Sequence, residues 1–320
     1  MTSVVHALKC AAALLVAVAA LALASSRLTS AQRPIQVLLV TGQSNRYHNW
    51  EVSSPIVKRQ LEESGRFAVS LKPTPPKGAT PNQDMSSFAP RFSDYQVVVL
   101  DYEGFEFSAP VKQALVDYIK NGGGLVVLHA ADNAFPGWPE YNEMIGVGGW
   151  GGFTPGYSNR TESAGPKIRW RDGRMLLDDT TPGTAQHPNP HGFLITNRAP
   201  EHPIMKGLPS AWLHANDELY SNLRGPAKNV TVLATAMAST SMRNGTGEHE
   251  PIIMTITYGK GRIVHDTLGH VGATQKEPIG AMNSVDYIVL LQRGTEWAAT
   301  GSVTIPVPKD FPTADRTSIR

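Results

Sequence analysis

Apolar runs alternate with amphipathic stretches along the first 130 positions of the chain. The runs at 34–42, 95–104 and 125–131 are almost continuously apolar, which is typical of strands buried on both faces, as in a parallel sheet. The segment at 66–74 has the residues of a further strand. Four strands are therefore predicted before position 132.

Two amphipathic stretches between these runs are typical of helices. In the first, Ser54 is a suitable cap, Pro55 suits the first helical position and Gly65 suits the end. In the second, Ser108 precedes an apolar stripe with helical spacing, and Gly122 follows it. The order strand, helix, strand implies right-handed crossovers, hence a parallel sheet with helices on both faces.

The later segments extend this α/β pattern. Residues 229–238 predict a strand, residues 251–270 a hairpin that turns at 259–261, and residues 284–301 an amphipathic helix. We therefore predict one α/β domain over residues 34–300, with a doubly wound, mainly parallel sheet. An extended tail is expected over residues 301–320.

The first 31 residues resemble a secretory signal peptide. One lysine precedes an apolar run of about 15 residues, and small residues ending at Ala24 and Ala31 fit cleavage sites. We expect export to the periplasm or the medium; an uncleaved anchor is the alternative. Cys10 is the only cysteine and lies in this segment. The mature chain would therefore contain no disulfide, thiolate metal ligand or cysteine nucleophile.

Composition excludes several partners. The 320 residues carry a formal net charge of +2 without a basic cluster, so nucleic acid is not an expected partner. The sequence contains neither a phosphate-binding P-loop motif nor a dinucleotide fingerprint, and no nucleotide cofactor is expected. It also lacks the G-x-S-x-G elbow of α/β-hydrolases. The pattern does not indicate an oligomeric state.

Histidines stand where predicted strands end. In a parallel sheet such ends point their loops to a common edge, so we expect four histidines to converge there with Asp217 or Glu218. Imidazole binds divalent metals and, with a carboxylate, supplies general acid and base. The four are His48, His129, His202 and His270.

Other interpretations of single residues stay open. A lone histidine at a strand end is more often a structural hydrogen-bonding group than a catalyst. His187 and His191 are four positions apart, but the prolines between them exclude the helix that would align them on a metal. A serine hydrolase would need Ser44 to pair with His48.

Five segments together resemble the ThuA-like (trehalose utilisation) family. They are VLLVTGQSNRYHNW, GGGLVVLHAADNAF, EHPIMKGLP, DELYSNL and GKGRIVHDTLGH, spread from about residue 35 to 270. The resemblance implies a flavodoxin-like, class I glutamine amidotransferase-like fold and a role in the metabolism of trehalose-like disaccharides and their 3-keto derivatives. Amidotransferases of that fold carry a cysteine at the elbow after the fourth strand. Here Ala130 and Ala131 follow His129, which argues against glutamine hydrolysis.

These observations predict an exported protein that acts on, or binds, a small saccharide or 3-keto-glycoside. The expected catalytic residues are His129, His48, His270 and Glu218, of which the three histidines are also candidate ligands of a divalent metal. The expected substrate-binding residues are Asp132, His202, Asp217 and Trp150. Glycines 148, 149, 151 and 152 suit a loop that closes over the site. The alternative is a non-catalytic, sugar-binding accessory module.

Overall fold

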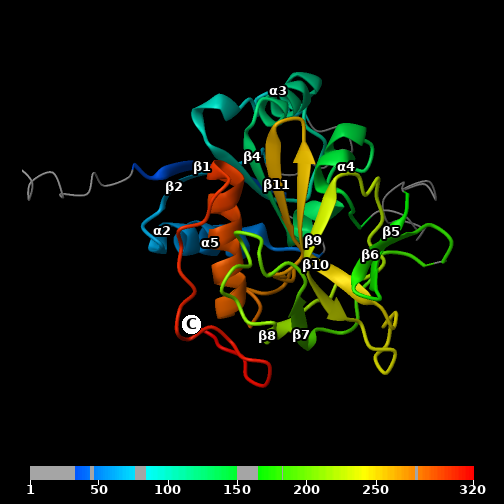
Figure 1. Ribbon diagram of the computed structural model, residues 1–320. Coiled ribbons are helices and arrows are strands. Elements are labelled where there is room, and N and C mark those ends of the chain that lie inside the picture. The colour runs from blue at the N-terminus through cyan, green and yellow to red at the C-terminus, as the bar shows by residue number, and fades with distance from the viewer. Residues whose placement is uncertain (1–32, 44–46, 76–83, 150–164, 182, 278–279) are drawn as a thin grey trace, which may run out of the picture. The chain divides into compact units, whose positions relative to one another are not determined.

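Nine strands of the described residues form one mixed sheet in the computed structural model (Figure 1). The structure describes residues 33–43, 47–75, 84–149, 165–181, 183–277 and 280–320, and residues 35–320 form one compact unit. The predicted signal segment, Ser44, Trp150 and the glycines at 151 and 152 lie outside the described residues. No described helix is long and apolar enough to span a membrane.

The first half of the sheet is parallel. Its strands follow the order β2-β1-β3-β4-β11, and every neighbouring pair in this half is parallel. Their bounds are β1 (Ile35–Gly42), β2 (Phe67–Pro73), β3 (Val97–Tyr102), β4 (Gly124–Leu128) and β11 (Gly261–Asp266). The carboxyl ends of these strands therefore share one edge of the sheet.

The second half of the sheet is antiparallel, so the prediction of a mainly parallel sheet is wrong. The order continues β11-β10-β9-β7-β8, with every pair antiparallel. These strands are β7 (His191–Asn197), β8 (Ala211–Asp217), β9 (Val230–Met237) and β10 (His249–Tyr258). Strand β7 lies between β8 and β9 and is antiparallel to both, so β8 and β9 run in the same direction. The predicted hairpin is confirmed, because β10 pairs with β11 across a turn at 259–260.

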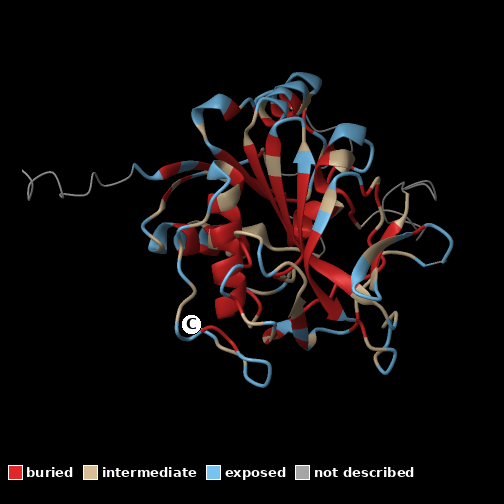
Figure 2. Ribbon diagram, in the orientation of Figure 1, coloured by how far each residue is buried: buried red, intermediate tan, exposed pale blue. Residues whose placement is uncertain are grey.

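Helices cover both faces of the sheet. Helices α2 (Trp50–Glu63) and α5 (Val285–Thr300) pack on one face, and α3 (Ala109–Lys120) and α4 (Pro139–Ile145) on the other. Figure 2 shows the central strands of the large sheet and much of α5 in the colour of buried residues. Each face thus has its own apolar core layer. Two short 3₁₀ helices, η1 (Phe92–Asp94) and η2 (His129–Asn133), and a separate hairpin of β5 (Lys167–Arg171) and β6 (Arg174–Asp178) complete the elements.

Helix α3 ends close to the predicted glycine, but α2 begins earlier than predicted. Asn49 is the residue before α2, and Pro55 lies inside the helix. Ser53 and Ser54 are buried and each donates a hydrogen bond of 2.6 Å to Asp101 Oδ2. Burial raises the pKa of Asp101 against the effect of these donors. The serines therefore anchor α2 to β3 instead of capping it.

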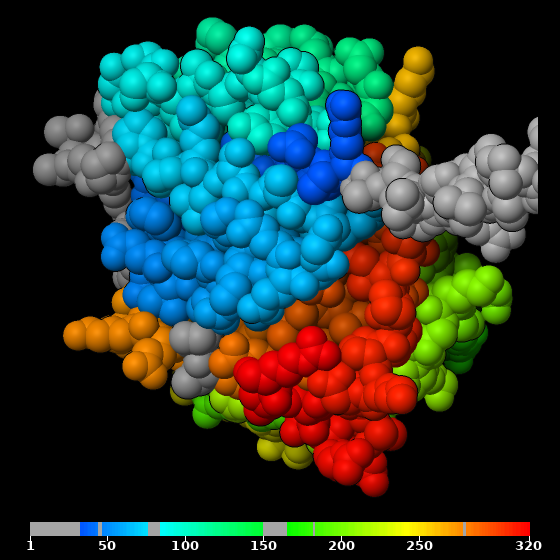
Figure 3. Space-filling view, turned by 90° about the vertical axis from the view of Figure 1, so that its left-hand side faces the viewer, coloured from blue at the N-terminus to red at the C-terminus, as the bar shows by residue number. Residues whose placement is uncertain are grey.

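Residues 301–320 form no helix and no strand of the sheet, and they pack on the domain. Figure 3 shows them in red on one face of the molecule. The Thr304 backbone donates a 2.7 Å hydrogen bond to buried Glu296 of α5. Further along, Phe311 packs edge-on against Trp212, with ring centroids 5.4 Å apart. The tail is thus fixed at several points.

Candidate functional site

Three histidines meet at the carboxyl edge of the parallel half. His48 lies in the connection from β1 to α2, His129 directly follows β4, and His270 follows β11. Their ring centroids are 5.3, 5.3 and 5.1 Å apart in the three pairs. One ring nitrogen from each lies within 4.8 Å of the others. We call this group the histidine cluster.

His129 occupies an unusual backbone position. Its φ angle is +26°, in the left-handed region that side chains rarely adopt. Such strain persists only where the surroundings hold the residue, and it concentrates at functional sites. Here His129 Nδ1 donates to the Thr267 carbonyl at 2.7 Å, and the ring stacks on Tyr220 with centroids 4.4 Å apart. The bond at Nδ1 leaves the lone pair of the neutral ring on Nε2.

Glu218 adds a carboxylate to the cluster. Its Oε2 atom lies 3.1 Å from His270 Nδ1 and 3.8 Å from His129 Nε2. The two ring nitrogens are 3.0 Å apart. The side chains of Glu218 and His270 are 11% and 17% exposed, so the cluster is buried without being sealed from solvent.

Two residues that the sequence analysis missed orient His48. Its Nδ1 atom forms a 2.6 Å hydrogen bond with Glu103 Oε2, and its Nε2 atom lies 3.4 Å from the Tyr220 hydroxyl. Glu103 directly follows β3, so its place after a buried strand was a usable signal. Tyr220 lies in an irregular segment with no comparable signal.

Burial controls the protonation of the cluster. It lowers the pKa of His129 well below the usual range, and the nearby His270 and His48 lower it further. Burial, followed by His48, lowers the pKa of His270 to about 4. Both rings are therefore neutral at neutral pH and offer lone pairs. Burial also raises the pKa of Glu218, against the opposing effect of His187 and His48.

The donor atoms suit a divalent metal ion. Zinc bonds to imidazole nitrogen at about 2.0–2.1 Å, which places neighbouring tetrahedral ligands about 3.4 Å apart. The distances of 3.0, 3.1 and 3.8 Å among His129, His270 and Glu218 lie around that value. Metal-binding histidines also usually donate their other N–H to a carboxylate or carbonyl. Glu103 and Thr267 occupy those positions for His48 and His129.

Asp217 has a different position from the one expected of a base or substrate ligand. It is buried and accepts backbone hydrogen bonds from Glu218, Gly269 and His270 at 2.8, 2.8 and 3.1 Å. Its Oδ2 atom also lies 3.1 Å from His214 Nε2. These contacts occupy the carboxylate and fix the backbone of two cluster residues.

The structure does not bring His202 to the cluster, contrary to expectation. Its ring packs against Trp297 in the last turn of α5, with centroids 5.0 Å apart. That turn lies at the amino end of β4, because the Ala298 carbonyl closely approaches Gly124. His202 therefore belongs to the opposite edge of the sheet. It follows β7, a strand of the antiparallel half, so the argument from the shared edge of parallel strands does not apply to it.

His187 lies beside the cluster although its motif was a weak signal. Its Nε2 atom is 3.5 Å from Glu218 Oε1, on the carboxylate oxygen that does not face the other histidines. The side chain is 38% exposed. His191 hydrogen-bonds locally to Asn189 and is near Phe193 instead. The two histidines of this segment thus have separate surroundings.

Asp132 lies buried in η2, three residues after His129. Its carbonyl accepts a hydrogen bond from Gly149, and Gly148 exchanges backbone bonds with Arg224. A Cβ at Gly149 would lie 1.8 Å from Asn133 Oδ1, so a larger residue there would have to displace the Asn133 side chain. The described start of the predicted lid is therefore attached to the domain.

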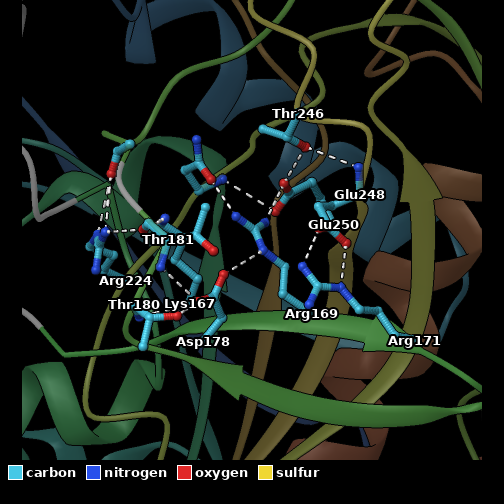
Figure 4. A network of polar contacts seen from close by, with 12 residues as sticks. Lys167, Arg169, Arg171, Asp178, Thr180, Thr181, Arg224, Thr246, Glu248 and Glu250 are labelled. Carbon is cyan, nitrogen blue, oxygen red and sulfur yellow. Dashed lines mark hydrogen bonds and ion pairs between the residues drawn. The ribbon is translucent and has the colours of Figure 1, made fainter.

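A buried ionic network supports the segment that carries Glu218 and Tyr220 (Figure 4). Arg169 of β5 donates to Glu250 of β10 at 2.5 Å and also to the Asn222 side chain. Glu250 in turn accepts from the Asn222 backbone at 3.2 Å. Arg169 and Glu250 are each 1% exposed. This network joins the β5–β6 hairpin, β10 and the segment next to the site.

Comparisons identify relatives of the chain. A family model described as ThuA, trehalose utilisation, matches residues 36–298. A ThuA-like protein from Parabacteroides merdae ATCC 43184 is 45% identical, with a TM-score of 0.82 over 90% of this chain and 98% of the other. A ThuA-like protein from Bacteroides uniformis ATCC 8492 is 16% identical, with a TM-score of 0.50 over 87% and 96%, and it shows a likeness of fold alone. No curated protein matches.

Proposed function

We propose, on the premise that this chain belongs to the ThuA (trehalose utilisation) family, that it acts on a small saccharide at a divalent metal site. The single observation that carries the proposal is the convergence of His48, His129 and His270 within 4.8 Å, with Glu218 beside them. The family description supports a saccharide as the substrate class. The donor set supports the metal.

The cluster residues have distinct roles in this proposal. The three histidines hold the ion, which when bound polarises a substrate carbonyl. Glu218 lies beside them with a raised pKa, so it suits removal of a proton from the carbon next to that carbonyl. A 3-keto-glycoside has such a carbon. Asp217 is occupied by backbone donors, and Glu218 is therefore the proposed base.

The elbow at His129 supports a flavodoxin-like origin for the parallel half. The order β2-β1-β3-β4-β11 is the one found in flavodoxin-like sheets, which place their sites at the carboxyl ends of the strands. We propose that His129 occupies the position of the amidotransferase nucleophile and serves as a ligand. The imidazole of His129 at this position suits binding of a metal or a proton better than formation of an acyl intermediate. Glutamine hydrolysis is therefore not the proposed reaction.

The test combines metal loading with turnover. The mature protein, purified and reloaded with Zn²⁺, Mn²⁺ or Co²⁺, is incubated with 3-keto-glycosides and with trehalose, and products are followed by mass spectrometry. We expect metal-dependent turnover that His129→Ala abolishes. Saccharide binding by thermal shift without turnover would favour the accessory module. Equal turnover by wild type and His129→Ala would reject the site.

We also propose that the first 31 residues direct export. The support is their lysine, apolar run and small residues at Ala24 and Ala31. Expression of the full chain in a bacterial host, followed by intact-mass measurement of the periplasmic fraction, tests this proposal. A mature chain beginning at residue 25 or 32 is expected. Full-length protein confined to the cytoplasm would contradict it.

A further inference from the structure

A second buried cluster lies directly behind the site. His214 of β8 is fully buried, and its two ring nitrogens face two carboxylates. Nδ1 lies 2.8 Å from Asp286 Oδ2, and Nε2 lies 3.1 Å from Asp217 Oδ2. Ionised carboxylates only accept hydrogen bonds, so both nitrogens act as donors and the ring is an imidazolium. Burial alone would lower the pKa of His214, but Asp286 and Asp217 outweigh it and raise it to about 10.

Each carboxylate is fixed by further donors. Asp286 in the first turn of α5 also accepts from Trp212 Nε1 at 2.8 Å and from the Ser284 hydroxyl. Burial would raise the pKa of Asp286, but His214 and these donors lower it. The three residues Asp286, His214 and Asp217 therefore form a continuous chain of charged hydrogen bonds, which is stronger than a neutral one.

This chain ends on the backbone of the site. Asp217 accepts from the amides of Gly269 and His270, which follow β11, and from the amide of Glu218. Gly269 has φ +97°, and a Cβ there would lie 2.7 Å from the Tyr287 ring of α5. The segment with His270 therefore packs against the first turn of α5. It is also connected to that turn by the hydrogen bonds through Asp217 and His214.

We propose that His214 is a positioning residue that sets the spacing of the ligand His270 and the base Glu218 by holding Asp217 against their backbone amides. His214 touches none of the reacting groups. The loop after β11 and the segment after β8 both donate backbone hydrogen bonds to the Asp217 carboxylate. His214 connects this carboxylate to Asp286 of α5. The proposal rests on the proposed function for its metal readout only.

The variants separate positioning from simple loss of packing. His214→Gln keeps a polar side chain but cannot bridge two carboxylates as a cation. Asp286→Asn retains the shape at the far end of the chain and removes its charge. Trp212→Phe is the packing comparison, because it removes one neutral donor to Asp286 from an equally buried position but keeps both charged hydrogen bonds of His214.

Two readouts are measured on the mature protein. Amide hydrogen exchange is followed over residues 217–219 and 268–271 without metal, and Co²⁺ affinity is measured together with the ligand-field spectrum. We expect faster exchange in both segments, about 10-fold weaker Co²⁺ binding and a shifted spectrum for His214→Gln. Asp286→Asn should change these in the same direction, and Trp212→Phe should change them less than His214→Gln does.

The outcomes distinguish the two proposals. Unchanged exchange at Gly269 and His270 in a folded His214→Gln, or equal effects of Trp212→Phe, would overturn the positioning role. If His214→Gln does not fold, exchange and Co²⁺ binding in Asp286→Asn decide the question by the same criteria. Absence of Co²⁺ binding by the wild type would contradict the metal site but not the exchange result.

Discussion

The Nε2 atom of His129 and the Nδ1 atom of His270 lie 3.0 Å apart, although 141 positions separate these residues in the sequence. Two buried neutral imidazoles at this distance share one proton between them. A divalent ion can replace that proton and satisfy both lone pairs. This relationship, with Glu218 3.1 Å from His270, is the physical basis of the proposed metal site.

Removal of the Glu103 side chain should weaken metal binding. Glu103 holds the Nδ1 atom of His48 at 2.6 Å, and partners of this kind typically change metal affinity about 10–100-fold. Glu103→Ala should therefore weaken metal binding about 10–100-fold. Glu103→Gln should weaken it less, because its amide oxygen still accepts the hydrogen bond from His48. Glu106→Ala is the control, since Glu106 pairs with Lys112 on the surface. Equal affinity of Glu103→Ala and wild type by competition titration would contradict this role.

The Tyr220 hydroxyl should matter for turnover more than for metal binding. The ring stacks on His129, and Phe preserves that contact. Burial raises the pKa of Tyr220, so the hydroxyl stays protonated and can donate to a substrate oxygen. We expect Tyr220→Phe to lower kcat by up to about 100–1000-fold, as loss of one such donor does, with unchanged metal content. Tyr258→Phe on β10 should behave as wild type, and the same kcat in both variants would exclude this role.

Two arginines of β5 should differ in their effect on stability. Arg169 is buried against Glu250, whereas the Arg171 side chain is 46% exposed beside Glu248. Arg169→Ala leaves a buried carboxylate unpaired and should cost about 3–5 kcal/mol of unfolding free energy. Arg171→Ala should cost far less, because solvent screens an exposed ion pair. Urea denaturation measures both; similar midpoints would show that the network is not important for stability.

His265 should make stability depend on pH. Burial lowers its pKa from 6.5 to about 4, although Nδ1 donates to the Ile145 carbonyl at 3.0 Å. The pKa of His265 is lower in the folded than in the unfolded state. The stability that the neutral ring contributes is therefore complete above pH 6.5 and is lost as pH falls through 4. The expected loss is roughly 3 kcal/mol.

The matched variant isolates that group. His265→Asn can donate to the same carbonyl but does not titrate in this range. The difference in unfolding free energy between wild type and variant, measured by urea titration at several pH values, should therefore decrease from pH 7 to pH 4. A difference independent of pH would show that His265 is not buried in the neutral form.

The sequence predicted the parallel half of the fold well because its signals are local. Continuous apolar runs and the glycine after α3 are readable without tertiary information. In the antiparallel half, β9 and the β10–β11 hairpin were predicted, but β7 and β8 were not, since their segments carry no regular apolar pattern. Helix α2 was misplaced because Ser54 resembles a cap, whereas its hydroxyl is used by Asp101, a partner that only the tertiary fold supplies.

The site was predictable in part for the same reason. His48, His129 and His270 follow strands that end at one edge, so topology alone placed them together. Tyr220 and His187 lie in irregular segments, and their proximity depends on how the antiparallel half packs. His202 follows no strand of the parallel half. Its half-buried imidazole packs on Trp297, a structural role that the sequence does not distinguish from a role in the site.

Metal content tests the central claim most directly. The mature protein is stripped with a chelator, dialysed against Zn²⁺, Mn²⁺ or Co²⁺, and analysed by elemental mass spectrometry beside His129→Ala, His270→Ala and His202→Ala. The account predicts about one equivalent of metal per chain in the wild type and in His202→Ala, and its loss in the two cluster variants. No bound metal in the wild type, or equal metal in all four proteins, would contradict it.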